Sequence, residues 1–454
     1  MTRTFHHSYK ESVFLIVTRF LFVLAFFVPI SASARQWTLE ECIEYAVHNN
    51  LSLKKRASDL RQSDIQLNSS KNSWLPEIRA DLGEQLSFGN YNASTGSMDA
   101  RPNDENRDLS YTTGSISASI NLFNGFKVMN SIKADQFNLD AATADLEQAR
   151  KDISIQVATQ YLQCLYYKGV SEVARLQVEL SRNLLERTVQ MVEEGKRPLS
   201  EQKEFESAFA EDCYTLSEAE GNYKLAMLAL AQFLNVPTDQ DFEICEVVDF
   251  PVMTQPADNI YENAQNSWPA LKAAKAKVEE SRYRVKIAQS GFYPTISLGG
   301  SLKTFNVNMF NQNLGFGNFG NQFFTNNPNQ VIGLQLSVPI FNRMQTRNNV
   351  LKAEETLQRR NVELEECNQN LQKDIQTACA NAEVAKEKEI AAQKSAEAAY
   401  TNLIYEQERY ELSRGSVYDI QQARQKYFKA SQKAVQSKYE YLIRQRILEF
   451  YQQF

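Results

Sequence analysis

Apolar residues in the C-terminal quarter of the chain recur three and four positions apart, which is the spacing of one face of a packed helix. The segment from Arg343 to Phe454 contains one glycine, Gly415, and no proline. We therefore predict a long helix over residues 346–412 and a return helix over 417–450. At about 1.5 Å per residue the first is roughly 100 Å long and the second roughly 50 Å, so other segments must cover half of the long arm.

Two pairs of segments alternate instead between apolar and polar residues, which is typical of β-strands with one apolar face. In the first, Ile78, Ala80 and Leu82 alternate with charged residues until Glu84 interrupts the apolar face, and we place Glu84 near the far rim. A long polar loop joins the two strands of each pair. We predict strands at about residues 76–88, 111–123, 294–303 and 330–341, and extracellular loops at 89–110 and 304–329.

The whole arrangement occurs twice. Residues 74–78 (WLPEI) resemble 292–296 (FYPTI), and Phe123 corresponds to Phe341, both at an offset of 218 positions. Such spacing indicates an internal duplication of a helix-strand-strand-helix-helix unit. The first repeat spans residues 35–237, with a helix from Thr38 to about Asn72, a long helix at 125–193 and a return helix at 199–235; residues 238–256 form a linker, and 257–454 form the second repeat.

The half-length helices explain how the long arms are covered. A helix over residues 38–72 and a return helix over 199–235, stacked end to end, match the length of the long helix at 125–193. Both repeats are therefore expected to build one elongated helical wall.

The N-terminus has the features of a secretory signal. Arg3 and Lys10 precede the apolar run at residues 20–30, and Ala32-Ser33-Ala34 supplies small residues before a cleavage site. We predict a signal peptide over residues 1–34, which takes the remaining chain out of the cytoplasm. An uncleaved N-terminal anchor is the alternative, although the apolar run is short for a membrane span.

Charge and composition give no support to nucleic-acid binding or catalysis. Net charge is −6, with +2 in residues 1–34 and therefore −8 in the rest, so no basic face is indicated. The six cysteines lack metal-ligand spacing; Cys367 and Cys379 are too far apart on one helix to bond each other, and other pairings stay open. His48 is the only histidine after residue 34, and phosphate-loop and HExxH motifs are absent, so we expect no enzyme, cofactor or metal site.

The strand pattern favours a membrane. Tilted strands of about 10 residues cross a bilayer, and one apolar and one polar face are typical of a barrel with a watery lumen. Four strands cannot close a barrel, and open edges in lipid leave backbone groups unpaired at a cost of several kcal/mol each. We predict a mainly α-helical chain that contributes four strands to a transmembrane β-barrel shared with other copies. A soluble sheet whose apolar face covers a core is the alternative.

Together these segments resemble the TolC family of outer membrane efflux proteins over nearly the whole mature chain. The resemblance rests on WLPEI and FYPTI, the strand ends LFNG and IFN, the turns EEGKRPLSE and ELSRGSVYD, and the duplication. It implies a homotrimer whose twelve strands form one barrel among the outer membrane lipids, continued by a helical tunnel across the periplasm. It also implies two partners, a periplasmic adaptor and an inner membrane pump of the RND or ABC type.

The resemblance also implies roles for the helical turns at the periplasmic mouth. In the family, a tyrosine and a basic residue near the second turn are tethered to an acid after the first turn, and further acids ring the pore. Tyr410 matches the tyrosine, Glu201 the tethered acid and Asp419 one ring acid. Without the resemblance, Asp419 is an ordinary acid in the first turn of a helix.

This chain departs from the family pattern at two positions of the mouth. Gly415 stands where the basic residue can lie, with Arg414 one step earlier, and Gln422 replaces the second ring acid. The adaptor is expected at the hairpin tips, residues Gly195, Lys196, Arg197, Arg414 and Gly415, and the barrel is expected to meet the tunnel at Pro76, Phe123, Pro294 and Phe341.

The leading hypothesis is a passive outer membrane channel that conducts small toxic molecules or drugs received from the pump and adaptor. A type I protein secretion channel is an alternative with the same fold. Two alternatives belong to other classes: a periplasmic coiled-coil scaffold or adaptor that never enters a membrane, and a hydrolase with added helices.

Overall fold

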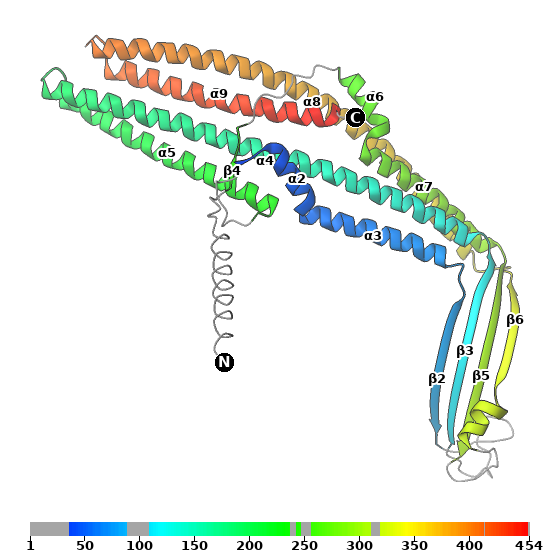
Figure 1. Cartoon of the computed structure of the whole chain (residues 1–454). Coiled ribbons are helices and arrows are strands. Elements are labelled where there is room, and N and C mark those ends of the chain that lie inside the picture. Colours follow the sequence, from blue (N-terminus) through cyan, green and yellow to red (C-terminus); the bar gives the residue numbers. More distant parts are fainter. Residues whose placement is uncertain are drawn as a thin grey trace, which may run out of the picture.

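The computed structural model describes residues 36–88, 109–236, 242–246, 256–309, 318–412 and 414–452. Long helices form one elongated body, and a four-stranded sheet extends from one end of it (Figure 1). The predicted signal peptide lies outside the described residues, as do most of the predicted loop at 89–110 and of the linker at 238–256.

Two helical hairpins make up most of the body. In the first, α4 (Lys127–Glu193) turns at Gly195 into α5 (Leu199–Leu234), and in the second α8 (Gln345–Glu411) leads into α9 (Val417–Gln452). The long helices have 67 residues each and the return helices 36 each, and they start at the offset of 218 positions seen in the sequence. Each long helix therefore spans roughly 100 Å.

Shorter helices cover the half of each long helix that the return helix leaves bare. The helices α2 (Leu39–Asn49) and α3 (Leu51–Asn72) pack on α4, and α6 (Ala257–Ser267) and α7 (Pro269–Gln289) pack on α8 (Figure 1). In addition, α7 contacts α4, so the two repeats form one body.

The prediction of one helix from Thr38 to about Asn72 is wrong. The chain breaks at Asn50, which is extended and whose side chain accepts a hydrogen bond from the backbone N–H of Ser52 at 2.8 Å. Asn50 thus ends α2 and caps α3, because a short polar side chain competes with the helix for backbone donors. In the second repeat the equivalent break is at Trp268, before Pro269.

A buried cluster between α2, α4 and α5 holds the middle of the body. Tyr161 is fully buried there, and its hydroxyl lies 2.9 Å and 2.6 Å from the backbone carbonyl oxygens of Trp37 and Cys245. These carbonyls flank a two-residue parallel pairing of β1 (Gln36–Trp37) with β4 (Glu243–Ile244). The pairing joins residues 36–37 to residues 243–244, and no pattern in the sequence predicted it.

The large sheet is antiparallel, with strand order β2-β3-β5-β6. Its register places Ile78, Ala118, Gly300 and Ile332 side by side, so the apolar faces of all four strands lie on one side. The opposite side carries mostly charged and small polar residues, as the alternation predicts, and also Tyr111, Phe305 and Val331 toward the free end. The strands are β2 (Glu77–Ser87), β3 (Leu109–Asn124), β5 (Thr295–Met309) and β6 (Asn329–Ser337).

All four strands differ from their predicted bounds by at least one residue, and two of them differ by four or more at one end. β5 runs six residues beyond the predicted end at residue 303, and β6 ends four residues before the predicted end at residue 341. β6 ends where its partner begins, because Ser337 pairs with Thr295, the first residue of β5. Pro339 also lacks an N–H with which to extend the ladder. Part of the predicted loop at 304–329 is a π-helical turn, η2 (Asn321–Asn326).

Matching turns connect strand to long helix in both repeats. The two residues before each long helix are left-handed: Gly125 and Phe126 before α4, with φ of 64° and 62°, and Arg343 and Met344 before α8, with φ of 57° and 62°. A Cβ atom at Gly125 would lie 2.7 Å from the carbonyl oxygen of Ser290, so only glycine fits there.

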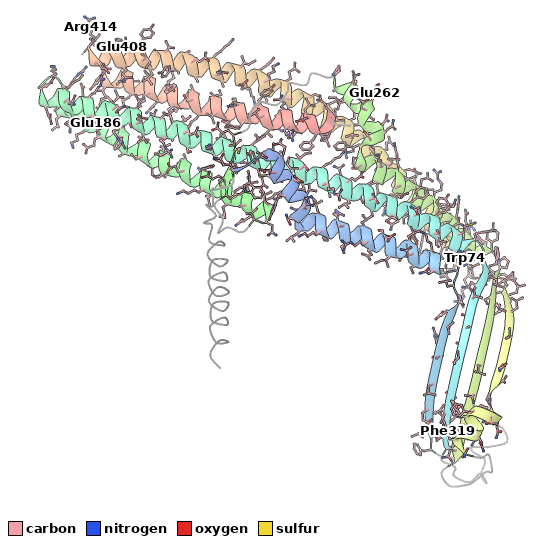
Figure 2. The ribbon with its side chains drawn as sticks, in the orientation of Figure 1. Trp74, Glu186, Glu262, Phe319, Glu408 and Arg414 are labelled. Carbon is pink, nitrogen blue, oxygen red and sulfur yellow. The ribbon has the colours of Figure 1, made fainter. Side chains whose placement is uncertain are left out.

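The predicted junction residues lie at this end of the helical body. Pro76 and Pro294 directly precede β2 and β5. Phe123 lies one residue before the end of β3, with its ring centre 5.2 Å from that of Phe126, and Phe341 is exposed. Figure 2 labels the neighbouring Trp74 at the bend between helices and sheet.

Candidate functional site

The two hairpin turns lie at the same end of the molecule, opposite the sheet (Figure 1). Figure 2 labels Arg414 at the tip of the second hairpin. Four helices approach one another just behind these turns, and their contacts form the candidate site.

Tyr410 is the centre of this site. Its side chain, on α8, is 1% exposed and packs with Leu184, Phe205 and Ile420 from the other three helices. Its hydroxyl donates a hydrogen bond to Glu201 Oε2 on α5 at 3.1 Å and lies 3.2 Å from Thr188 Oγ1 on α4. One side chain of the second hairpin is thus inserted between both helices of the first.

Burial also sets the protonation of this tyrosine. Removal from water is the main cause that raises the pKa of Tyr410. The contact with the Thr188 hydroxyl lowers this pKa, the Glu201 carboxylate raises it, and Arg197 lowers it slightly. The hydroxyl therefore keeps its proton and remains a donor at neutral pH.

Arg197, from the turn of the first hairpin, completes the site. Its Nη1 lies 3.4 Å from Glu201 Oε1, and its Nη2 donates to the backbone carbonyls of Tyr410 and Gly415, both at 3.2 Å. The guanidinium carbon is 4.5 Å from the centre of the Tyr410 ring, within the range of a cation–π interaction. Arg197 therefore bridges the two hairpins.

The sequence pattern placed Arg197 among the exposed tip residues, whereas its side chain is 12% exposed. The basic residue beside Tyr410 and Glu201 comes from the first turn and not from the second. Two features of the sequence are consistent with this contact. Gly415 has no side chain at the position where the family can have its basic residue, and Arg197 lies four positions before Glu201, within reach of it.

The other predicted mouth residues do not join this cluster. Arg414 is exposed at the tip, and Gln422 is exposed on α9. Asp419 accepts a hydrogen bond from the Ser416 hydroxyl at 2.8 Å, and its backbone N–H donates to Ser416 Oγ at 3.2 Å. Ser416 and Asp419 thus form a reciprocal cap at the start of α9. In the first turn, Lys196 forms an ion pair with Glu194 at 2.6 Å, and Gly195 has φ of 70°.

A second buried contact, which was not predicted, joins the hairpins farther from the tip. Arg424 Nη1 on α9 donates to Asp212 Oδ2 on α5 at 3.0 Å, and the two side chains are 4% and 13% exposed. Burial raises the pKa of Asp212 and lowers that of Arg424, and their mutual attraction opposes both shifts. Charged groups so well buried need each other, because either one alone would remain uncompensated.

Two absences apply to the ranges that the structure describes. None of the helices there combines the length and the hydropathy required to cross a bilayer. No group of three or more His, Cys, Asp or Glu side chains there is placed to hold a metal ion.

Two helical hairpins of tunnel length, joined to a sheet that is apolar on one side and polar on the other, define a subunit of an outer membrane channel. A sequence profile of the outer membrane efflux protein family matches residues 42–236 and 260–451. The chain belongs to this family. Each matched segment covers most of one repeat.

Individual relatives agree with this assignment. The chain is 21% identical to the outer membrane protein TolC of Vibrio cholerae over 435 residues, covering 93% of this chain and 92% of TolC. It is 20% identical to the outer membrane efflux protein BepC of Brucella suis over 351 residues, covering 77% and 70% of the two chains. The outer membrane channel CmeC of Campylobacter jejuni has the same fold, with a TM-score of 0.78 at 18% identity over 91% of this chain and 85% of that one.

The protein is therefore a channel of the outer membrane that extends into the periplasm and serves efflux. Its fold is mainly helical with a transmembrane β-barrel portion, as predicted. Channels of this family form trimers and work with an adaptor and an inner membrane pump.

Proposed function

We propose that three copies of this chain close a twelve-stranded barrel in the outer membrane and a helical tunnel below it. The tunnel passively conducts small toxic molecules received from a periplasmic adaptor and an inner membrane pump of the RND or ABC type. The chain catalyses no reaction, because the pump supplies the energy for transport.

The open sheet is the observation that supports this proposal. In the described residues β2 and β6 lie at the two edges of the sheet, and neither pairs with a further strand. In lipid, each unpaired backbone group costs several kcal/mol, so the edges need partners. Three sheets of four strands, each pairing β6 with β2 of the next copy, satisfy every edge and place the apolar side toward lipid.

The cluster around Tyr410 supports a closed mouth at the other end. Separating the hairpins would remove Tyr410 from Phe205, break its hydrogen bond to Glu201 and strip Arg197 of its carbonyl acceptors. The closed arrangement is thus held by several weak contacts that an adaptor at the exposed tip residues, such as Lys196 and Arg414, can offset on docking. Asp419 and Gln422 line the constriction in this proposal.

Single-channel recording in planar bilayers tests the proposal. The purified detergent-solubilised protein should be a trimer and should show low conductance, whereas Glu201→Ala should raise conductance because Tyr410 loses its acceptor. Glu201→Gln retains an acceptor oxygen and serves as the matched control with near wild-type conductance. A monomer that is soluble without detergent would contradict the barrel, and wild-type conductance in Glu201→Ala would contradict the closed mouth.

A further inference from the structure

An aromatic turn covers part of the sheet near its free end. The turn η2 folds over the strands at the end remote from the helices, where Figure 2 labels the preceding Phe319. The ring of Phe323 lies against Gly114, at which a Cβ atom would come within 2.5 Å of the ring. The hydroxyl of Thr304 donates to the backbone carbonyl of Phe323. Glycine at position 114 therefore allows the ring to lie against the strand.

Side-chain amides hold this turn on β5. The pairing of β5 with β6 ends at Lys303, so β5 continues to Met309 beyond its β6 partner. There the Gln322 side chain accepts from the Val307 N–H and donates to its carbonyl, both at 3.1 Å, and so imitates a neighbouring strand. Asn327 donates to the carbonyl of Phe305 at 2.8 Å. The turn is thus fixed in place by three hydrogen bonds to the backbone of β5.

A groove of about 550 Å³ lies between η2 and the sheet. The strand register shows that the groove is on the apolar side of the sheet. Leu82 pairs with Gly114, and Ile116 pairs with Leu302, on the same face as Ile78 and Ile332. Its size is within the range of small-ligand sites. The apolar lining comes from Leu82, Ile116, Leu302, Phe323, Phe324 and Pro328.

We propose that this groove binds one acyl chain of an outer-leaflet lipid in each protomer. The inference rests on the proposed barrel, in which the apolar side of the sheet faces lipid and the free end of the strands lies at the cell surface. The groove is continuous with that lipid-facing side, so a lipid chain reaches it without leaving the bilayer. An exported molecule does not, because it travels on the opposite, polar side.

The side chains around the groove mark the boundary of the bilayer. On the same face, the next pair toward the free end of the strands is polar, Glu84 with Thr112. Glu84 accepts a hydrogen bond from the Ser110 hydroxyl. Phe324 and Phe319 are 72% and 49% exposed, and exposed aromatic rings are typical of the membrane interface in barrels of this kind. A lipid with its chain in the groove thus has its headgroup beside Glu84 and Thr112.

Native mass spectrometry of the trimer tests this site, with dioleoylphosphatidylethanolamine added back to delipidated protein. The wild type should retain up to three lipids per trimer. Ile116→Trp fills the groove and should lower occupancy about tenfold, because an acyl chain loses its apolar contacts there. Leu334→Trp is the matched control, since it adds the same side chain to the same face outside the groove and should retain three lipids.

Phe324→Ala removes one wall of the groove without changing a strand, and it should also lower occupancy. Equal lipid retention in Ile116→Trp, Phe324→Ala and Leu334→Trp would mean that lipid only surrounds the barrel, and a wild-type trimer without bound lipid would also overturn the groove. A wild type that is not trimeric would instead contradict the proposed function, and the groove with it. The oligomer peak and the lipid count come from the same spectrum, so these failures are distinguished.

Discussion

Arg197 contributes contacts to both hairpins at the mouth, through Glu201 on its own side and two backbone carbonyls on the other. Hydrogen bonds to charged groups contribute about 1.5–3 kcal/mol each, so losing them should shift the balance between closed and open mouths about tenfold or more. We predict that Arg197→Ala raises single-channel conductance or open probability in planar bilayers.

Arg414→Ala is the matched control for this prediction. It removes the same charge from the exposed tip of the second hairpin, where it should leave conductance unchanged. An effect of Arg414→Ala as large as that of Arg197→Ala would return the tethering role to the second turn.

The raised pKa of Tyr410 predicts how the closed mouth responds to pH. Because the folded-state pKa lies above the ordinary value of 10.0, the hydrogen bond to Glu201 stabilises the closed state fully below about pH 10 and is lost as pH rises through the folded pKa. Conductance should therefore stay low up to about pH 10 and rise above it.

Tyr410→Phe separates this effect from general alkaline changes. It lacks the hydroxyl, so its conductance should be raised already at neutral pH and should not change further as the tyrosine titration range is crossed. A rise of the wild-type conductance below pH 9, or the same alkaline rise in both proteins, would contradict the assignment.

Asp419 provides a prediction about ion selectivity. Three copies facing one axis would attract cations and repel anions. We predict that Asp419→Asn lowers the cation-to-anion permeability ratio, measured from reversal potentials in a salt gradient. Ser416→Ala weakens the helix cap while keeping the carboxylate, so it should leave selectivity unchanged. Equal permeability ratios in wild type and Asp419→Asn would reduce Asp419 to its capping role.

At this scale the sequence gives only part of the site. The family resemblance pairs Tyr410 with Glu201, and the structure places their polar atoms 3.1 Å apart. The spacing of Arg197 from Glu201 allows their contact but does not establish it, because the direction of the Arg197 side chain depends on the conformation of the turn at Gly195. Asp212 and Arg424 were missed for a different reason: two charged residues on helices far apart in sequence have no local signature.

At the scale of elements, the periodicity of apolar residues predicts which segments are helices and how long they are. The position at which a helix is interrupted depends on single side chains. The long and return helices match the prediction to within two residues at each end because their apolar spacing is long and uninterrupted. The break at Asn50 depends on one side-chain hydrogen bond to the backbone. The extension of β5 to Met309 follows its pairing with β3 as far as Leu109, and three side-chain hydrogen bonds cover its other edge. Such bonds depend on tertiary contacts that the helix and strand patterns do not encode.

The buried ion pair between α5 and α9 predicts an asymmetric response to mutation. Asp212→Ala leaves the Arg424 guanidinium buried without its partner, at a cost of about 3–5 kcal/mol. Replacing both groups, as Asp212→Leu with Arg424→Met, removes both desolvation costs and should restore stability to near the wild-type value. The midpoint of thermal unfolding of the detergent-solubilised protein, followed by circular dichroism, measures both.

Arg175 and Glu220 form the control pair on the first hairpin. They also bridge α4 and α5, at 2.8 Å, but both side chains are well exposed. Arg175→Ala should therefore change stability by about 1 kcal/mol or less. If Asp212→Ala were as mild as Arg175→Ala, the buried pair would not couple the hairpins.

At the scale of the whole molecule, the sheet is the part that needs other copies. The helical body buries two apolar clusters within one chain, around Tyr161 and Tyr410. The sheet instead exposes large apolar side chains on one side, among them Ile332, Leu334 and Leu336 of β6. Alternation and duplication predicted these faces, whereas the identity of the neighbour at each edge follows only from the need to pair β2 and β6.

Adjacent residues of β6 test the orientation of the whole sheet. Leu334 lies on the apolar side and Gln335 on the opposite side. An arginine on the lipid side of a barrel costs about 2–4 kcal/mol at the bilayer midplane, whereas lumen substitutions change selectivity. With three copies in each barrel, Leu334→Arg should strongly reduce the amount of folded trimer in isolated outer membranes, and Gln335→Arg should assemble normally but favour anions in bilayer recordings. If Leu334→Arg assembles and Gln335→Arg does not, the apolar side faces the interior of the assembly, and lipid contacts the other side.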